Sequence, residues 1–281
     1  MAKLVHHMGL VYYRLKFQTL SAISTKAAAK EAIELFSTPQ FRKKLKLSKI
    51  LEESEKLEIN MNGESITGYR WNYGGRRKLL IVHGFNSSVI KFDRYINPLI
   101  KKGYEVLAFD AKGHGYSSGK TLNAVEFKDM IIEINKLYGP IKSFIGHSFG
   151  GLALSLALEE IPHDENYRLG LIAPSTESKS AIDYFFKFMM LNDKVRIEFD
   201  DLIFRLSQKP PEWYSVSRAI ENIKAKVFWC HDEDDFICPW DDAKNVMDKN
   251  YKHVDFFVTK GFGHHRIYKE PKVANAIIDF L

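Results

Sequence analysis

From about residue 54 onward, short runs of β-branched and aliphatic residues alternate with longer stretches of helical periodicity. This alternation constrains the fold more than any other feature of the chain, because strands that alternate with helices form a mostly parallel sheet covered on both faces. The continuous apolar runs Leu79–Val82 and Val106–Phe109 are typical of strands buried on both sides. We therefore predict an α/β fold.

The predicted strands are Lys56–Asn60, Ile66–Trp71, Lys78–Val82, Tyr104–Phe109, Ile141–Ile145, Arg168–Ala173, Val227–Cys230 and Val254–Val258. The predicted helices between them are Ile90–Lys102, Leu122–Leu137, Phe149–Glu159, Trp240–Lys249 and Tyr268–Phe280. A further helix is predicted from Val11 to Phe36, ending before Thr38-Pro39, because the residue before a proline avoids the α region.

Three parts of the chain differ in their sequence pattern. Residues 1–50 form a basic helical arm, residues 51–174 and 226–281 form the α/β core, and residues 175–225 interrupt the alternation. A loop that long without structure is uncommon, so we predict a helical insertion there. Its eight aromatic residues either line an apolar pocket or pack the insertion onto the sheet, and the sequence leaves both open.

Composition and length exclude several classes of protein. The chain has 281 residues, of which 45% are hydrophobic and 27% charged, which excludes disordered and fibrous proteins. Charges interrupt every apolar run before the roughly 18 to 20 residues that a membrane-spanning helix needs. No secretory signal pattern stands at the N-terminus, so we expect a cytoplasmic protein. Cys230 and Cys238 are expected to be reduced, buried thiols.

The net charge of +6 is concentrated at one end of the chain. Residues 1–50 hold ten Lys and Arg against two Glu, a balance of +8, so the remaining residues sum to −2. A basic amphipathic segment of this kind can make weak contact with an anionic surface, although such a face is more often simply solvated. No nucleic-acid motif accompanies the charge, so nucleic acid is not an expected partner. The oligomeric state is not predictable from the sequence.

The strongest local motif is the run Gly146-His147-Ser148-Phe149-Gly150-Gly151, between a predicted strand and a predicted helix. The pattern G-x-S-x-G in this setting is a nucleophile elbow, in which a tight turn exposes the serine hydroxyl at the edge of the sheet. Ser148 is therefore the candidate nucleophile, at the positive end of the following helix.

A serine nucleophile needs a base. His264 follows Gly261-Phe262-Gly263 on the loop after the last predicted strand, at the same sheet edge as Ser148. An imidazole titrates near neutrality, so it can take the hydroxyl proton and return it to a leaving group. We favour His264 over His265 because the glycines before it let its side chain turn inward.

A carboxylate must orient the imidazole. Four acidic residues follow the strand that ends near Cys230, and Asp235 is the preferred candidate, with Asp232 and Asp234 as alternatives. The order Ser, Asp, His along the chain is the order found in α/β-hydrolases.

An oxyanion hole is predicted after the strand that ends at Val82. His83-Gly84-Phe85 follows this strand, and the glycine lets backbone amides approach a substrate oxygen. The backbone N–H groups of Phe85 and Phe149 are the predicted donors. Asp110 and His114 are interpreted as braces of a shaped turn, and His147 as a packing residue. No metal-ligand spacing is present, so no metal or cofactor is expected.

With these motifs in their order, residues 57–281 resemble the α/β-hydrolase superfamily, specifically its serine-aminopeptidase-like and monoglyceride-lipase-like members. The resemblance implies an eight-stranded, mostly parallel sheet with helices on both faces. It also implies a small helical lid at residues 175–225 and hydrolysis without a cofactor through an acyl-enzyme.

We therefore expect a serine hydrolase that cleaves carboxylic ester or related acyl bonds of a small, apolar substrate. Peptidase and thioesterase activities use the same machinery, so the fold does not choose among them. The alternative from another class is a hydrolase-fold binding or signalling module with little turnover.

Overall fold

The structure is a computed structural model that describes residues 2–40 and 46–281, with side chains described from residue 9 onward. In this described part, eight strands form one sheet in the order β1-β2-β4-β3-β5-β6-β7-β8. Strand β2 is antiparallel to β1 and β4, whereas β3 to β8 all pair in parallel. The predicted mostly parallel α/β sheet is confirmed. The strands are β1 (Glu55–Met61), β2 (Glu64–Trp71), β3 (Arg77–Val82), β4 (Tyr104–Phe109), β5 (Ser143–His147), β6 (Arg168–Ile172), β7 (Lys226–Asp232) and β8 (Val254–Thr259).

Along the chain, the longer helices lie before, between and after the strands. They are α1 (Ala2–Ile23), α2 (Thr25–Ser37), α4 (Asp93–Lys101), α5 (Ala124–Tyr138), α6 (Phe149–Glu160), α7 (Ser178–Met189), α8 (Asp193–Ser207), α10 (Trp240–Asp248) and α12 (Pro271–Phe280). Single-turn helices are α3 (Lys49–Glu52), α9 (Val216–Ala219), α11 (Gly263–Arg266) and the 3-10 turns η1 (Val89–Phe92), η2 (Pro211–Trp213), η3 (Ile220–Asn222) and η4 (Ile267–Lys269).

The chain divides into two compact units. One unit comprises Met1–Thr38 and Ser178–Tyr214, and the other comprises Pro39–Glu177 and Ser215–Leu281. The sheet lies entirely in the second unit. The predicted N-terminal arm and the predicted insertion thus contribute their main helices to the same unit.

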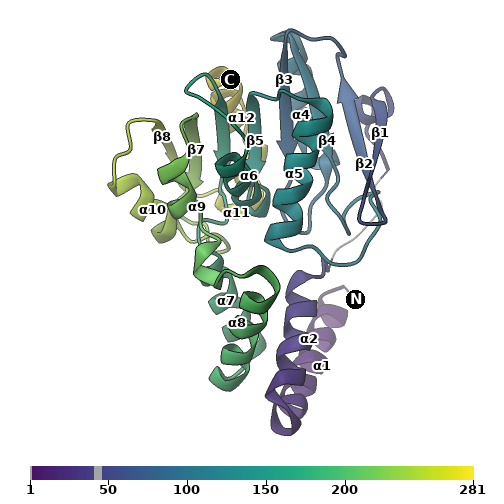
Figure 1. Ribbon diagram of the computed structural model, residues 1–281, viewed down its shortest axis with the longest axis vertical. Coiled ribbons are helices and arrows are strands. Elements are labelled where there is room, and N and C mark those ends of the chain that lie inside the picture. The colour runs from purple at the N-terminus through teal and green to yellow at the C-terminus, as the bar shows by residue number, and fades with distance from the viewer. Residues whose placement is uncertain (1, 41–45) are drawn as a thin grey trace. The chain divides into compact units, whose positions relative to one another are not determined.

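In the sheet unit, apolar side chains are buried on both faces of the central strands. Leu79, Ile81 and Val106 share an apolar cluster with residues of α4 and α12. Because successive side chains of a strand point to opposite faces, Leu80 and Leu107 belong to the other face. Helices α5 and α6 contact each other in front of the sheet, and α12 lies behind it (Figure 1).

In the helical unit, the aromatic residues of the insertion pack against the N-terminal helices. Phe186 of α7 and Phe199 of α8 are buried in one cluster with Phe17 of α1 and with the small residues of α2. These small residues are Ala28, Ala29 and Ala32, all fully buried, and they let α8 approach α2 closely. The two segments therefore bury each other's apolar faces, which a single helix pair would leave exposed.

The N-terminal helical pattern contains a break that the sequence prediction did not include. A single helix was predicted over 11–36, but α1 ends at Ile23 and α2 begins at Thr25. Ser24 between them is extended, with φ −158° and ψ 113°, and its side chain accepts a hydrogen bond from the N–H of Ala27. A serine in this position caps the second helix, and this cap replaces the continuous helical bonding.

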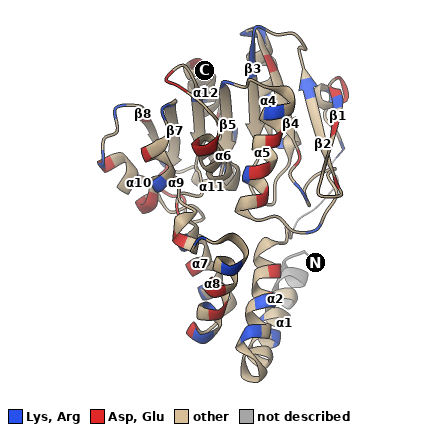
Figure 2. Cartoon of the chain, viewed as in Figure 1, with Lys and Arg blue, Asp and Glu red and all other residues tan. Residues whose placement is uncertain are grey.

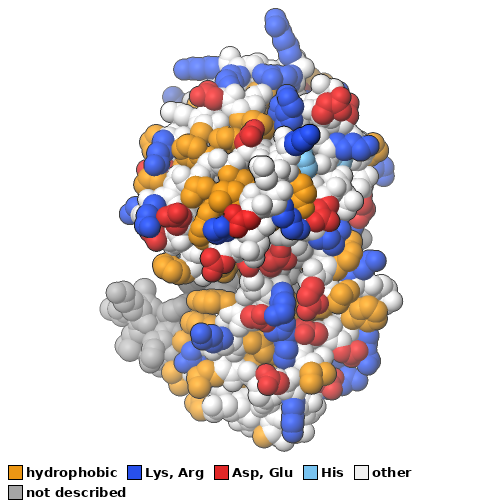
Figure 3. Space-filling view, turned by 90° about the vertical axis from the view of Figure 1, so that its left-hand side faces the viewer, with side chains coloured by type: hydrophobic (Ala, Val, Ile, Leu, Met, Phe, Trp, Pro, Cys, Tyr) orange, Lys and Arg blue, Asp and Glu red, His pale blue; other side chains and the backbone are white. Residues whose placement is uncertain are grey.

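The surface of the helical unit carries both charges and large apolar side chains. Helices α7 and α8 hold five basic and five acidic residues, whereas the described charges of α1 and α2 are mainly basic (Figure 2). Exposed apolar side chains include those of Leu15, Tyr184 and Leu206. Such side chains lie between charged ones on the face seen in Figure 3.

Contact of residues 1–50 with an anionic surface stays a prediction. Of the ten basic residues behind it, the side chains of Lys3, Arg42, Lys43 and Lys44 lie outside the described part. Among the helices of the described chain, none combines the length and apolar character that a bilayer crossing requires.

Candidate active site

The predicted site residues follow four strands whose carboxyl ends meet at one edge of the sheet. Phe85 follows β3, Ser148 follows β5, Asp235 follows β7 and His264 follows β8. Strand β3 lies between β4 and β5, so the two strands that follow it in the sequence lie on opposite sides of it. The strand order therefore reverses at β3. Such a reversal opens a crevice at the carboxyl ends of the strands, where ligands bind in open α/β sheets.

Ser148 lies in the sharp turn between β5 and α6. Its backbone has φ 54° and ψ −126°, a conformation that costs a non-glycine residue about 1 to 3 kcal/mol. Hydrogen bonds hold the turn in place: the N–H of Ser148 donates to the carbonyl of Ile172 over 3.1 Å, and its carbonyl accepts the N–H of Gly151 over 2.9 Å. The strained backbone is thus fixed by the neighbouring strand and the first turn of the helix, and it matches the predicted elbow.

Close backbone approach explains two of the glycines around Ser148. A Cβ atom at Gly150 would lie 2.4 Å from the carbonyl oxygen of His83, and a Cβ atom at Gly84 would lie 2.8 Å from the Cβ of Ser148. Both distances are too short for any side chain. The loop after β3 therefore contacts the nucleophile turn directly.

His264 connects Ser148 to Asp235. Its Nε2 lies 2.9 Å from Ser148 Oγ, and its Nδ1 lies 2.7 Å from Asp235 Oδ2. All three side chains are at least nine-tenths buried. Because a carboxylate only accepts, Nδ1 carries the proton, and Nε2 of the neutral ring is left to accept the proton of the serine hydroxyl. The structure brings together the three residues chosen from the sequence, whereas His265 is exposed.

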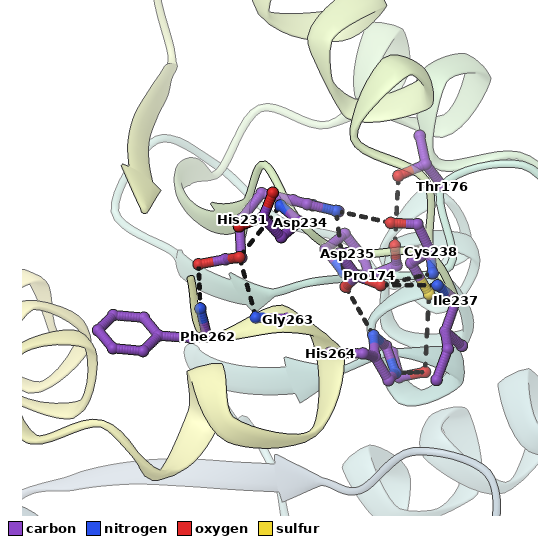
Figure 4. Close-up of polar contacts among 12 residues, drawn as sticks. Pro174, Thr176, His231, Asp234, Asp235, Ile237, Cys238, Phe262, Gly263 and His264 are labelled. Carbon is purple, nitrogen blue, oxygen red and sulfur yellow. Dashed lines mark hydrogen bonds and ion pairs between the residues drawn. The ribbon is translucent and has the colours of Figure 1, made fainter. Parts of the chain in front are cut away.

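The alternative carboxylates have other partners. Asp232 accepts hydrogen bonds from the N–H groups of Phe262 and Gly263 over 3.1 and 2.9 Å, and Asp234 accepts the N–H of Gly261 over 3.0 Å. Both therefore hold the loop that carries His264, and Figure 4 shows the bonds from Phe262 and Gly263 to the carboxylate of Asp232. Burial opposes ionisation of Asp232, but hydrogen bonds to its carboxylate outweigh burial and lower its pKa.

Asp235 is fixed by the backbone of its own loop. Its Oδ1 accepts the N–H groups of Ile237 and Cys238, each over 2.9 Å, which leaves Oδ2 for His264 (Figure 4). The two oxygens of one carboxylate thus have separate tasks. One shapes the loop, and the other orients the imidazole.

The charge state of His264 depends on its neighbours. Burial disfavours the imidazolium, but Cys238 and the carboxylate of Asp235 favour it more strongly, so the pKa of His264 is raised above its usual range. A histidine acts as a base only while it is neutral. Any reaction that uses His264 as a base should therefore become faster as the pH rises through this pKa.

The two predicted amide donors come from residues that contact each other. The rings of Phe85 and Phe149 pack edge to face with centroids 5.7 Å apart. Within the part of the chain that is described, neither N–H group has a hydrogen-bond partner. Phe149 begins α6, and the first N–H groups of a helix have no partner within it.

His83 holds the loop of Phe85, a role that the sequence prediction missed. Its Nδ1 donates to the carbonyl of Gly84 over 2.8 Å, and its Nε2 accepts the N–H of Ala111 over 2.9 Å. The carbonyl of Gly84 and the N–H of Phe85 belong to one rigid peptide group, so His83 fixes the direction of that N–H. The signal in the sequence was the histidine immediately before the glycine.

The buried imidazole of His83 should make stability depend on pH. Burial lowers the pKa of His83 from 6.5 to about 4, so the unfolded chain binds a proton that the folded chain does not bind between these values. The neutral imidazole of His83 therefore contributes to the free energy of unfolding above pH 6.5. This contribution is lost as the pH falls toward 4, by at most about 3 kcal/mol. We expect urea unfolding to show a smaller loss of stability in His83→Gln than in the wild type between pH 7 and 4. Equal losses in the two proteins would contradict this assignment.

Two further predicted roles concern neighbouring residues. The carboxylate of Asp110 accepts the N–H groups of Val89 and Tyr116 over 2.9 and 3.0 Å, so it braces the loop after β4. The ring of His147 packs on the ring of His264 with centroids 4.9 Å apart. Among the described residues, no group of three or more His, Cys, Asp or Glu side chains is arranged to hold a metal ion.

Cys238 is the other residue whose place the sequence prediction missed. Both cysteines are free and buried, as predicted. However, the sulfur of Cys238 lies 3.8 Å from Ser148 Oγ. In the sequence, Cys238 stands three residues after the candidate carboxylate in the same loop, but this spacing does not fix its distance from Ser148.

Comparison with known proteins gives a family match and a set of shared folds. Residues 75–199 match the family of serine aminopeptidases, S33. Over 84 residues the chain is 36% identical to bifunctional epoxide hydrolase 2 of Sus scrofa, a match that covers 28% of this chain and 15% of that protein. The chain therefore spans only a small part of the length of this curated relative.

Solved structures share the fold over most of the chain. An esterase from Pyrococcus furiosus superposes with a TM-score of 0.65 at 21% identity, covering 87% of this chain and 95% of the esterase. Mouse α/β hydrolase domain-containing protein 10 superposes with a TM-score of 0.59 at 18% identity, covering 80% of this chain and 96% of that one. Together with the family match over residues 75–199, these superpositions show that the chain has an α/β-hydrolase fold.

Proposed function

We propose that the protein is a serine hydrolase that cleaves carboxylic ester or related acyl bonds through an acyl-enzyme. The observation that carries the proposal is the position of His264, which joins Ser148 Oγ over 2.9 Å to Asp235 Oδ2 over 2.7 Å. This arrangement of nucleophile, base and orienting carboxylate is the one that activates a serine hydroxyl.

In the proposed reaction, Ser148 Oγ attacks the carbonyl carbon of the substrate while Nε2 of His264 takes its proton. Asp235 accepts the Nδ1 hydrogen bond throughout, and so stabilises the imidazolium that forms. The imidazolium then protonates the leaving group, and the acyl group stays on Ser148. Water, deprotonated by the same imidazole, releases the acid and restores the hydroxyl.

The developing oxyanion needs donors beside Ser148. The N–H groups of Phe85 and Phe149 fit this task, since both are without an acceptor in the described part of the chain and their side chains are in contact. Loss of one such donor typically slows acyl transfer by a factor of about 10² to 10³. Because both donors are backbone groups, the positioning residue His83 is the accessible target for mutation.

An apolar acyl group is the substrate that the surroundings favour. The ring of Phe149 packs against the rings of Phe85 and Phe127 beside the elbow. Aromatic side chains around a reactive centre bury apolar surface of a ligand. The likeness to an esterase agrees with the cleavage of an ester bond.

A fluorophosphonate probe and a substrate series test the proposal. We expect one probe molecule to bind each wild-type chain at Ser148, and a series of p-nitrophenyl esters to be hydrolysed faster than aminoacyl p-nitroanilides. Preference within the series for longer acyl chains would follow from the apolar surroundings. A wild type that neither reacts with the probe nor hydrolyses any ester would instead indicate a binding module.

A further inference from the structure

The edge of the sheet at which the parallel strands begin carries an excess of basic residues. Strands β3 to β8 run in parallel, so the segments that lead into them all lie at this edge, opposite the candidate active site. Counted from the end of the preceding element through the first residue of the strand, these segments hold nine Lys and Arg and two acidic residues. The segments are 72–77, 102–104, 139–143, 161–168, 223–226 and 249–254.

This balance of +7 contrasts with the rest of the chain after residue 50. Residues 51–281 have a total charge of −2, so the positions outside these segments sum to −9. Both acidic residues of the edge, Asp164 and Glu165, stand in the single segment before β6. Figure 2 shows blue segments around the strand ends at the top of the view, and basic side chains project at the top of the same unit in Figure 3.

Three of the basic residues stand at neighbouring positions of adjacent strands. Arg168 begins β6 and is the register partner of Lys226, which begins β7, and its N–H donates to the carbonyl of Lys142 over 2.9 Å. Adjacent strands are about 4.8 Å apart, so these three positions form a continuous row. Like charges at such positions repel each other and reduce stability. The requirements of folding therefore do not explain this row.

Few of the cations at this edge are neutralised within the chain. Lys102 pairs with Asp279 over 3.7 Å, and Lys249 pairs with Glu221 over 3.0 Å. Five further exposed cations, which we call the basic edge, have no ion-pair partner in the described part of the chain. They are Arg76, Lys142, Lys224, Lys226 and Lys252.

Two exposed apolar side chains accompany the basic edge. Tyr73, in the segment before β3, is 76% exposed, and Leu137, near the end of α5 and so close to the start of β5, is 53% exposed. Cations are attracted by the anionic headgroups of a membrane, and aromatic and aliphatic side chains enter the layer beneath these headgroups. The side chains at this edge thus provide both kinds of contact that a membrane surface offers.

We propose that this edge of the sheet unit binds the surface of a bilayer that contains anionic lipids. Four of the five residues of the basic edge are lysines. The ammonium group of lysine is a point charge that suits a diffuse layer of headgroups, whereas the planar fork of arginine suits the individual phosphates of a nucleic acid. Binding at this edge uses no residue of the candidate active site, so the proposal does not rest on the proposed function.

Sedimentation of the full-length chain with lipid vesicles tests the proposal. We expect the wild type to bind vesicles of phosphatidylcholine with about 30% phosphatidylglycerol, and not vesicles of phosphatidylcholine alone. Binding should weaken as the concentration of NaCl rises from about 0.05 M to about 0.5 M, because salt screens exposed charges. The triple variant Lys224→Gln/Lys226→Gln/Lys252→Gln should bind about a hundred-fold more weakly, since each lysine contributes a factor of about five.

A triple variant in the helical unit is the matched control. Lys26→Gln/Lys30→Gln/Lys187→Gln removes the same amount of charge at exposed positions that have no ion-pair partner among the described residues. This control should bind the anionic vesicles within a few-fold of the wild type. Both variants should keep the circular dichroism of the wild type, because the replaced side chains are exposed.

Several outcomes would overturn the proposal. A wild type that does not bind the anionic vesicles even at low salt would show that this edge is simply solvated. Equal losses in the two triple variants would assign the binding to net charge, and a loss confined to the control would assign it to the helical unit. A wild type that binds a single-stranded RNA oligonucleotide but no vesicle would show that the basic edge is a nucleic-acid surface.

Discussion

Replacing Ser148 with alanine is expected to lower kcat/KM for a p-nitrophenyl ester by about 10⁴-fold to 10⁶-fold. The variant lacks the atom that attacks the carbonyl, while the amide donors and His264 remain in place and leave a small residual rate. The fold should persist, because the turn is held by backbone hydrogen bonds of Ser148 and not by its hydroxyl. Initial rates, together with circular dichroism, measure both effects.

Ser155 offers a matched control for this substitution. It is a buried serine of the same helix, and its hydroxyl donates to the carbonyl of Gly151 over 2.9 Å. Ser155→Ala should keep the rate within a few-fold of the wild type, since its hydroxyl has no contact with His264. A Ser148→Ala variant within ten-fold of the wild type would show that another group is the nucleophile.

Replacing Asp235 with asparagine is expected to lower kcat by about 10⁴-fold with little change in the fold. The amide oxygen can still accept the N–H groups of Ile237 and Cys238, so the loop keeps its shape. The amide nitrogen then faces Nδ1 of His264, and this donor favours the tautomer that carries its proton on Nε2. In this tautomer the imidazole cannot accept the proton of Ser148.

Asp234→Asn is the control for the carboxylate. Asp234 lies in the same loop, but its carboxylate accepts the N–H of Gly261 instead of contacting His264. Its variant should retain a rate within about ten-fold of the wild type, because only one hydrogen bond to a charged acceptor is weakened. If Asp234→Asn were the slower of the two variants, the orienting role would belong to Asp234.

Much of the sheet unit could be predicted from the sequence because its signals are local. Apolar strand runs and helical periodicity indicated the eight strands, with errors of one or two residues such as β5, which begins at Ser143 and not at Ile141. The site residues Ser148, Asp235 and His264 each follow a strand, and parallel strands end at one edge. Their convergence therefore followed from the topology.

Other features depend on contacts between distant segments and could not be predicted this way. Nothing local in α2 indicates that its alanines face Phe199 in the insertion, because this pairing depends on which helices bury each other's apolar faces. The distance between Cys238 and Ser148 likewise depends on the exact path of the loop that Asp235 and His231 hold. A residue type in a sequence does not reveal such a contact.

The most direct test of the central claim is to trap the covalent intermediate during turnover. Wild-type protein mixed with excess p-nitrophenyl ester is quenched in acid within milliseconds, digested, and analysed by mass spectrometry. We predict that the peptide that carries Ser148 gains the mass of the acyl group, that this mass is absent from Ser148→Ala, and that it accumulates when deacylation is slowed. Rapid ester hydrolysis with no acyl group on this peptide at any quench time, or with the acyl group on another residue, would contradict the claim.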